Sequence, residues 1–329
     1  MPLRTAQSRT AQFRTAEYPR PNHTILHLSD TRLLAGPASG RLLFDRVDPE
    51  ARLRRLIERL EASGTRPEAI VFTGDLSELG EPDAYATLRS IVDPVAERLG
   101  AVPIWVPGER DSREAFRTGL LGQLPSDAPI HRVVFLDGLR VITLDTSVPG
   151  SHHGELDPGQ LDWLSAELAT PAPYGTILAM HHPPVPSLVD LDVAVELRDQ
   201  SALARVLGGS DVRGIIAGHV HFSTTATFAG IPVSVASATC YGQDLTAPLG
   251  SQRARDGGQS YNLVSVFDET VMHTVVPVID DPIVSWISAD ESARLLELEE
   301  VVIEESAVAM ARREESRQQQ PLVWDVAGP

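Results

Sequence analysis

The residues able to do chemistry in this chain stand where apolar runs end. Acidic or imidazole side chains follow these runs at five places: Asp30, Asp75, His181, His219 and His221. In open α/β sheets, ligands bind beyond the carboxyl ends of the strands, so side chains at these positions gather at one edge. A single histidine there is most often structural, but five aspartates and histidines in the same topological position indicate a shared metal or catalytic site.

The mixture of side chains indicates which ions such a site would bind. Carboxylate oxygens together with imidazole nitrogens suit first-row divalent metals such as Mn, Fe and Zn. Two such ions about 3.5–4 Å apart stabilise both the attacking and the leaving oxygen of an in-line phosphoryl displacement. His219 and His221 are two residues apart, and a loop that turns over a strand end would let them reach two adjacent ions.

Alternating strands and helices are expected to position these side chains. Apolar residues recur at helical spacing over residues 50–62, and residues 69–73 are typical of a buried strand that ends at Gly74-Asp75. Asp137-Gly138, between two apolar runs, indicates a hairpin. Similar patterns predict helices over about 82–99, 160–168 and 197–207, and strands over 102–106, 176–180 and 214–217. This alternation predicts βαβ units, an α/β fold and a partly parallel sheet.

Five short blocks carry a family resemblance. In chain order they are Asp30-Thr31-Arg32, Gly74-Asp75-Leu76, Gly108-Glu109-Arg110-Asp111, His181-His182-Pro183 and Gly218-His219-Val220-His221. With them, residues 24–280 resemble the calcineurin-like metallophosphoesterases, and most of all the class III cyclic nucleotide phosphodiesterases of actinobacteria. The resemblance implies a four-layer α/β/β/α sandwich with two facing mixed sheets. It also implies hydrolysis of cyclic nucleotides or related phosphodiesters by metal-activated water.

The resemblance further implies a role for each position of the blocks. Two ions would share Asp75. The first would take Asp30, Asp75, His221 and the residue at position 32, and the second would take Asp75, His181, His219 and the residue at position 109. The catalytic positions of the family hold Arg110 and Asp111, and the positions expected to contact substrate hold Arg32, Arg110 and His182.

Three of these positions depart from the family pattern. Arg32 and Arg110 stand where the family has histidine, and Glu109 stands where it has asparagine. Arginine is always protonated and has no lone pair for a metal. We therefore hypothesise that Arg32 occupies the place of the first ion and pairs with Asp30, Asp75 or Glu109. A mononuclear site would remain, with Asp75, Glu109, His181 and His219 as ligands of one Mn, Fe or Zn ion.

Arg110 has two interpretations. It can donate two hydrogen bonds to phosphate oxygens and supply a fixed positive charge. It cannot act as a general acid near neutral pH, because its pKa is above about 12. The alternative is that Arg110 only pairs with Asp111 or Glu109 and the site has lost its chemistry.

Two functions therefore stay open at this point. The first is a slowed or altered phosphodiesterase that acts on a cyclic nucleotide or another small phosphodiester. The second is a catalytically inactive pseudoenzyme that binds a nucleotide or a protein partner. Loss of one ion and of the residue that assists the leaving group could remove several kcal/mol of transition-state stabilisation, and about 1.36 kcal/mol is tenfold in rate.

The composition excludes several other classes. The chain has 329 residues and a formal charge of −17, so general nucleic-acid binding is not expected. Cys240 is the sole cysteine, which excludes an intrachain disulfide and fits a reducing compartment. No apolar run approaches about 18 residues, and no signal peptide is recognised. We expect a cytoplasmic protein, and the family resemblance suggests a homodimer.

Three segments are expected along the chain. Residues 1–22 carry four arginines against one acid in a five-residue repeat, which is typical of a disordered basic arm. Contact of this arm with the inner membrane surface is an alternative to its having no specific role. Residues 23–280 form the metallophosphoesterase domain. Residues 281–329 form a C-terminal extension with a charged helix at about 290–316, either a packing helix or a docking helix.

Overall fold

The first of two main sheets holds the N-terminal strands. The computed structural model describes residues 18–35 and 41–297. In this sheet the strand order is β13-β12-β1-β2-β3, with β1, β2 and β3 parallel and β12 and β13 antiparallel to their neighbours. The strands are β1 (His23–Leu28), β2 (Ala69–Thr73), β3 (Val102–Val106), β12 (Ser260–Val266) and β13 (Val271–Pro277).

The second sheet is built from the middle of the chain. Its order is β4-β5-β6-β7-β9-β8, and β5, β6, β7 and β9 are parallel. The strands are β4 (Arg132–Leu136), β5 (Leu139–Thr143), β6 (Thr176–Ala179), β7 (Val212–Ala217), β8 (Thr224–Phe228) and β9 (Ile231–Val235). A short ribbon of β10 (Gly242–Gln243) and β11 (Ala254–Arg255) stands apart from both sheets.

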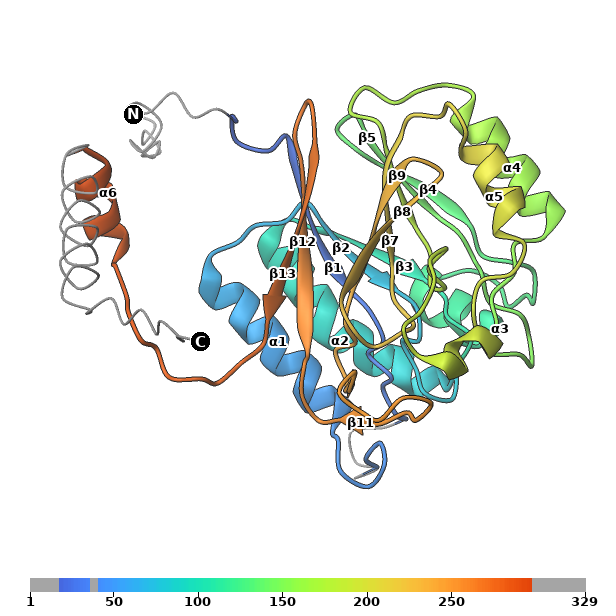
Figure 1. The fold of residues 1–329 in the computed structure, drawn as a ribbon, viewed down its shortest axis with the longest axis horizontal. Helices are drawn as coiled ribbons and strands as arrows, with labels where there is room; N and C mark the ends of the chain where they lie inside the picture. The colour runs from blue at the N-terminus through green and yellow to red at the C-terminus, as the bar shows by residue number, and fades with distance from the viewer. Residues whose placement is uncertain (1–17, 36–40, 298–329) are drawn as a thin grey trace, which may run out of the picture. The chain divides into compact units, whose positions relative to one another are not determined.

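Helices cover the outer face of each sheet, as Figure 1 shows. The first sheet carries α1 (Pro49–Ser63) and α2 (Pro82–Leu99), and the second carries α4 (Pro158–Leu168) and α5 (Gln200–Leu207). Shorter helical segments are α3 (Arg113–Phe116), η2 (Arg117–Leu121) and η3 (Asp190–Ala194). Local sequence fixes α1, because the Asp48 side chain accepts a hydrogen bond from Ala51 N and Gly64 ends the helix in the left-handed conformation.

A third apolar layer lies between the sheets. It contains Ile25 and Val71 from the first sheet and Ile177 and Ile216 from the second, all fully buried. Strands buried on both faces explain why β2 and β6 are continuous apolar runs instead of alternating ones. The result is the four-layer α/β/β/α sandwich with two facing mixed sheets that the family resemblance implies.

The predicted N-terminal arm and C-terminal extension are described by the structure only in part. Arg20–Ile279 forms one compact unit, and the described residues before and after it belong to a second unit. In the second unit, α6 spans Ala289–Glu297, while the rest of the predicted 290–316 helix lies outside the described residues, as do residues 1–17 of the basic arm. Among the described helices, none is both long enough and apolar enough to cross a membrane.

A candidate metal centre beside an arginine pair

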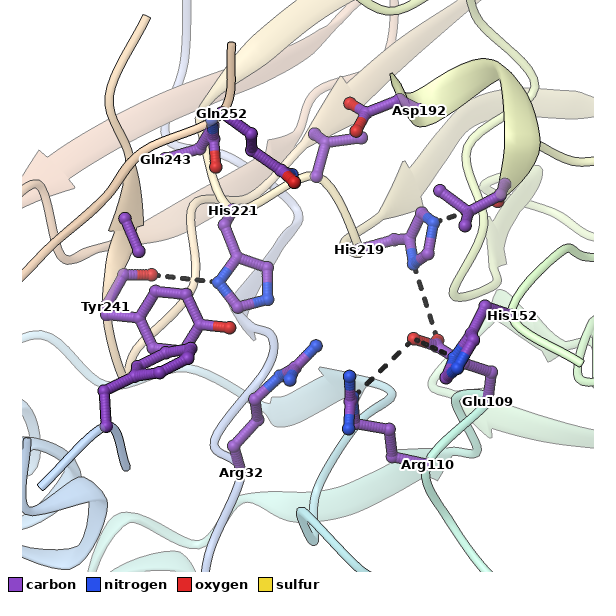
Figure 2. A pocket seen from close by; sticks show the side chains of 14 residues that line it. Arg32, Glu109, Arg110, His152, Asp192, His219, His221, Tyr241, Gln243 and Gln252 are labelled. Carbon is purple, nitrogen blue, oxygen red and sulfur yellow. Dashed lines mark hydrogen bonds and ion pairs between the residues drawn. The ribbon is translucent and has the colours of Figure 1, made fainter. Parts of the chain in front are cut away.

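The strand ends of both sheets meet at one cavity. Asp30 follows β1, Asp75 follows β2 and Glu109 follows β3 in the first sheet, while His181 follows β6 and His219 follows β7 in the second. The cavity has a volume of about 450 Å³. Figure 2 shows Arg32 and Arg110 near each other on one wall, with Glu109 and His219 to one side and His221 to the other.

The backbone at this centre is held in a conformation that ordinary residues avoid. The φ angle is positive at Asp30, Arg32, Asp75, His219 and His221, between 46° and 76°. Such left-handed residues cost on the order of 1–3 kcal/mol each and are concentrated at functional sites. The turns aim these side chains off the strand ends and into the same space.

Two glycines make this crowding possible. A Cβ at Gly74, where φ is 94°, would collide with the imidazole of His181. A Cβ at Gly108 would collide with the backbone and carboxylate of Asp75. The glycines of the Gly-Asp and Gly-Glu blocks are therefore needed because side chains from other strands pack directly against the backbone there.

Each histidine of the centre is oriented by a backbone carbonyl. His181 Nδ1 donates to Thr73 O at 2.6 Å, His219 Nε2 donates to Val195 O at 3.0 Å, and His221 Nδ1 donates to Tyr241 O at 3.0 Å. Since a carbonyl only accepts, the bonded nitrogen carries a proton, so in the neutral form of each ring the lone pair is on the other nitrogen. In all three rings this second nitrogen faces a carboxylate, which is the arrangement that metal-binding histidines use.

Glu109 stands at the centre of the imidazole group. Its Oε2 lies 2.8 Å from His181 Nε2, 3.4 Å from His219 Nδ1 and 3.8 Å from His182 Nε2. Ligand atoms of these four residues all lie within 4.8 Å of one another, and so do those of Asp30, Asp75 and His181. One carboxylate among imidazoles is a donor set that Mn, Fe and Zn accept. The residues present therefore fit a divalent ion between Glu109, His181 and His219.

The other half of the centre is filled differently. Arg32 Nη2 lies 3.0 Å from Asp75 Oδ2, and the Arg32 side chain is only 8% exposed. Asp30 Oδ1 lies 3.2 Å from His221 Nε2, so these two groups face each other. A buried guanidinium thus lies against the Asp75 carboxylate, which the family resemblance gives as a ligand of both ions.

Glu78 joins the two arginines. Its Oε2 accepts a hydrogen bond from Arg32 Nη1 and its Oε1 accepts one from Arg110 Nη1, both at 3.0 Å. Arg110 Nε is farther from the other acids, 3.7 Å from Asp75 Oδ2 and 4.0 Å from Glu109 Oε1. Asp75 is one of the three partners predicted for Arg32, whereas Glu78 is not among them. Its position three residues after Gly74-Asp75, in the loop that holds the shared carboxylate, is the signal that could have found it.

The pKa values follow from burial and from this crowding of charge. Burial raises the pKa of Asp75, and the Glu109 carboxylate raises it further. Burial would raise the pKa of Glu109 as well, but hydrogen bonds from His181 and His219 outweigh it and hold that pKa well below its usual range. Burial lowers the pKa of His181, yet Asp75 and Glu109 overcome this and raise it to about 10. Because the Glu109 carboxylate raises the pKa of Asp75, a cation between the two carboxylates would be favourable.

Two of the predicted site residues, His182 and Asp111, are held by hydrogen bonds to other groups of the protein. His182 Nδ1 is bonded to Thr146 Oγ1 at 2.8 Å and its Nε2 to His152 O at 3.1 Å, so both ring nitrogens are engaged by the protein. Asp111 points into the backbone of the neighbouring loop. Its carboxylate accepts hydrogen bonds from Leu76 N, Ser77 N, Gly108 N and Tyr85 OH. Neither residue lines the cavity.

Two facing sheets, with carboxylates and imidazoles gathered at their strand ends, define the metallophosphoesterase class of α/β proteins. A family model described as calcineurin-like phosphoesterase matches residues 23–223. The chain belongs to the calcineurin-like phosphoesterase family. This family implies a divalent metal, and the chain has residues that could hold one.

Comparison with individual proteins gives the same assignment. A probable cyclic nucleotide phosphodiesterase of Rhodococcus erythropolis is 58% identical over 298 residues, which cover 89% of this chain and 96% of that protein. A cAMP/cGMP dual specificity phosphodiesterase of Mycobacterium tuberculosis is 53% identical over 314 residues, covering 95% and 96%. A dimetal phosphatase from Danio rerio shares the fold, with a TM-score of 0.55, 15% identity, and coverage of 80% of this chain and 98% of that one.

Proposed function

We propose that this protein is a metal-dependent phosphodiesterase for cyclic nucleotides, with one ion and reduced turnover. The observation that carries the proposal is the position of Arg32, 3.0 Å from Asp75 Oδ2, beside the closely grouped ligand atoms of Glu109, His181 and His219. The half of the centre that holds Arg32 would bind no ion, while the other half would bind one. The cyclic nucleotide phosphodiesterases of high identity support this substrate class.

In this proposal the ion is held by Asp75, Glu109, His181 and His219. When bound, a divalent ion lowers the pKa of a water molecule and polarises a phosphoryl oxygen. The backbone carbonyls behind the histidines fix the ring orientation, so that the ligand nitrogens are in place before the ion arrives.

Arg110 would bind the phosphate. It lines the cavity, its side chain is 30% exposed, and its Nη2 has no hydrogen-bond partner recorded among the described residues. Its Nη1 is fixed by Glu78, which leaves Nη2 free to donate to a phosphate oxygen. Arg32 would add a buried positive charge behind it. Neither arginine can protonate a leaving alkoxide near neutral pH, because the pKa of arginine is above about 12. The reduced rate follows from this.

We assign positioning parts to Asp111 and His182. Asp111 ties the loop after β2 to the loop after β3, so it holds Asp75 and Glu109 in register. The His182 ring packs against the His219 ring, with ring centroids 4.4 Å apart, and so restricts the orientation of that ligand.

The test is a measurement of bound metal per chain together with hydrolysis of bis(p-nitrophenyl) phosphate and cyclic AMP in Mn²⁺. One ion and slow turnover are expected, and Asp75→Ala should lose both. Asp127→Ala, at an exposed site away from the cavity, is the matched control and should keep both. Two ions per chain would refute the part given to Arg32.

The second candidate is the pseudoenzyme. Arg110 in the place of the leaving-group histidine, tied to Glu78, is the observation that favours it. This function predicts nucleotide or partner binding with no turnover above the Asp75→Ala level, in a folded protein.

The other proposals come from the sequence. We propose a catalytic unit over 23–280, a basic arm over 1–22 and a C-terminal extension over 281–329. The assembly would be a homodimer in the cytoplasm, and the basic arm would be the part that contacts a membrane. Light scattering after gel filtration tests the dimer, and a chain without residues 1–22 tests the arm by its binding to anionic vesicles.

A further inference from the structure

The cavity has two chemically different ends. The charged end holds the carboxylates, histidines and arginines described above. The other end is formed by apolar surfaces and uncharged amides, namely Phe44, Val220, Tyr241, Gln243, Gln252 and Ala254. These side chains have no part in binding a metal, so their composition indicates which part of a ligand this end of the cavity would bind.

Phe44 is exposed because its loop is anchored from both sides. Leu43 and Val47 are buried against Ala238 and Cys240, and they bond to each other through their backbones. Phe44 lies between these anchors with a φ of 52°, and 67% of its surface stays exposed. Exposure of a large aromatic ring in a concave site is typical of a surface that a ligand covers.

Tyr241 connects the two ends. Its ring lies 5.1 Å from the Phe44 ring at 75°, and 4.5 Å from the His221 ring. The Arg32 guanidinium carbon lies 5.7 Å from the centre of the same ring. A ligand whose flat group packs on Phe44 would therefore extend toward the arginines and the metal ligands.

Two amides complete the apolar end. Gln243 lies on β10, and its backbone N donates to His221 O at 3.0 Å, which fixes the β10–β11 ribbon beside the centre. Gln252 lies in the connection between these strands, and Figure 2 shows its side chain extending over the cavity. Within the described part of the chain, neither side-chain amide has a recorded hydrogen-bond partner. Each can offer one donor group and one acceptor to a ligand.

We propose that this end is a nucleobase subsite, in which a base packs against Phe44 and its polar edge meets Gln243 or Gln252. An aromatic ring binds the face of any base, and glutamine amides match the donor and acceptor pattern of a purine edge. The inference rests on the proposed function, because the phosphate of the same nucleotide would occupy the charged end. It adds that this protein distinguishes nucleotides from phosphoesters that have no base.

The test compares 5′-AMP with ribose 5-phosphate by calorimetry on the full chain in Mn²⁺. The two ligands share the sugar and the phosphate and differ in the base. Stacking of one base corresponds to roughly 5- to 150-fold in affinity, so AMP should bind at least fivefold more tightly. Equal affinity for the two ligands would overturn the subsite and leave the phosphate site intact. If neither ligand binds, the proposed function fails as well.

Variants test which side chains cause the preference for AMP over ribose 5-phosphate. Phe44→Ala should weaken AMP binding by fivefold or more and leave ribose 5-phosphate unchanged, whereas Phe44→Trp should keep the preference for AMP. Leu42→Ala, on the same loop and also exposed, is the control and should change neither affinity. Gln243→Leu combined with Gln252→Leu should weaken AMP alone. The subsite is wrong if Phe44→Ala binds AMP as the wild type does, or if it weakens both ligands equally.

Discussion

Replacement of Arg32 by histidine should create a second metal site. The change removes the guanidinium from Asp75 Oδ2 and supplies an imidazole lone pair at the position where the family has histidine. Asp30, Asp75 and His221 are already in place around it, since Asp30 Oδ1 lies 3.2 Å from His221 Nε2. We expect the wild type to bind one ion per chain and Arg32→His to bind two.

The structure also gives the size of the stability change. At 3.0 Å, Arg32 and Asp75 attract each other by about 5.5 kcal/mol at an effective dielectric constant of about 20. Much of that attraction offsets the cost of burying both charges. Removal of one partner from a buried pair costs about 3–5 kcal/mol, so metal-free Arg32→His should lose that much unfolding free energy. Manganese at about 100 times its dissociation constant should return about 2.7 kcal/mol.

The assay is metal content per chain after gel filtration, with urea unfolding in chelator and in manganese. Arg98→His is the control, because Arg98 forms an exposed pair with Glu61 far from the centre and should change neither quantity. The double variant Arg32→His/Arg110→His removes any hindrance from the neighbouring guanidinium. If that double variant is folded and still binds one ion, or if the wild type already binds two, the reasoning about Arg32 is refuted.

Three further predictions concern the surroundings of the centre. Glu78→Gln should cost about 1–3 kcal/mol of stability, because Arg32 and Arg110 both lose a charged hydrogen-bond acceptor. It should also raise the KM for bis(p-nitrophenyl) phosphate more than it lowers kcat. Glu61→Gln is the control, and an unchanged KM in Glu78→Gln would contradict the role of Glu78 in joining the two arginines. Gly74→Ala should cost on the order of 1–3 kcal/mol and lower the metal content, because its Cβ would displace His181, whereas Gly64→Ala, with open space around its Cβ, should keep the metal. Burial lowers the pKa of His27 to about 3 from 6.5, so the unfolded chain binds more protons between these values and stability falls as pH drops below 6.5. From pH 7 to pH 5 the loss from His27 is about 2 kcal/mol, and His27→Gln should reduce this pH dependence in urea unfolding; an identical pH slope in the variant would rule the explanation out.

The sequence alone determined the fold and the main members of the centre. Apolar runs ending in aspartate or histidine predicted the strands, because strand length and burial are local properties of the chain. The right-handed βαβ rule places such residues at the carboxyl edge of their own sheet. Asp75 belongs to the first sheet and His181 and His219 to the second, and only the family resemblance implied that two sheets face each other. The substitution of histidine by Arg32 was also visible, since charge and the lack of a lone pair belong to the residue type itself.

Only the tertiary structure decided how the charges pair. Arg32 and Arg110 are distant in sequence, and Glu78 joins them because the loops after β1, β2 and β3 lie side by side at one edge of the first sheet. The carbonyls that orient the histidines, the placement of Asp111 in its backbone cradle and the exposure of Phe44 depend in the same way on contacts between distant segments. Periodicity records which face of an element is buried, but the direction of a side chain in an irregular loop is set by the packing of its neighbours, and that information is absent from any local pattern.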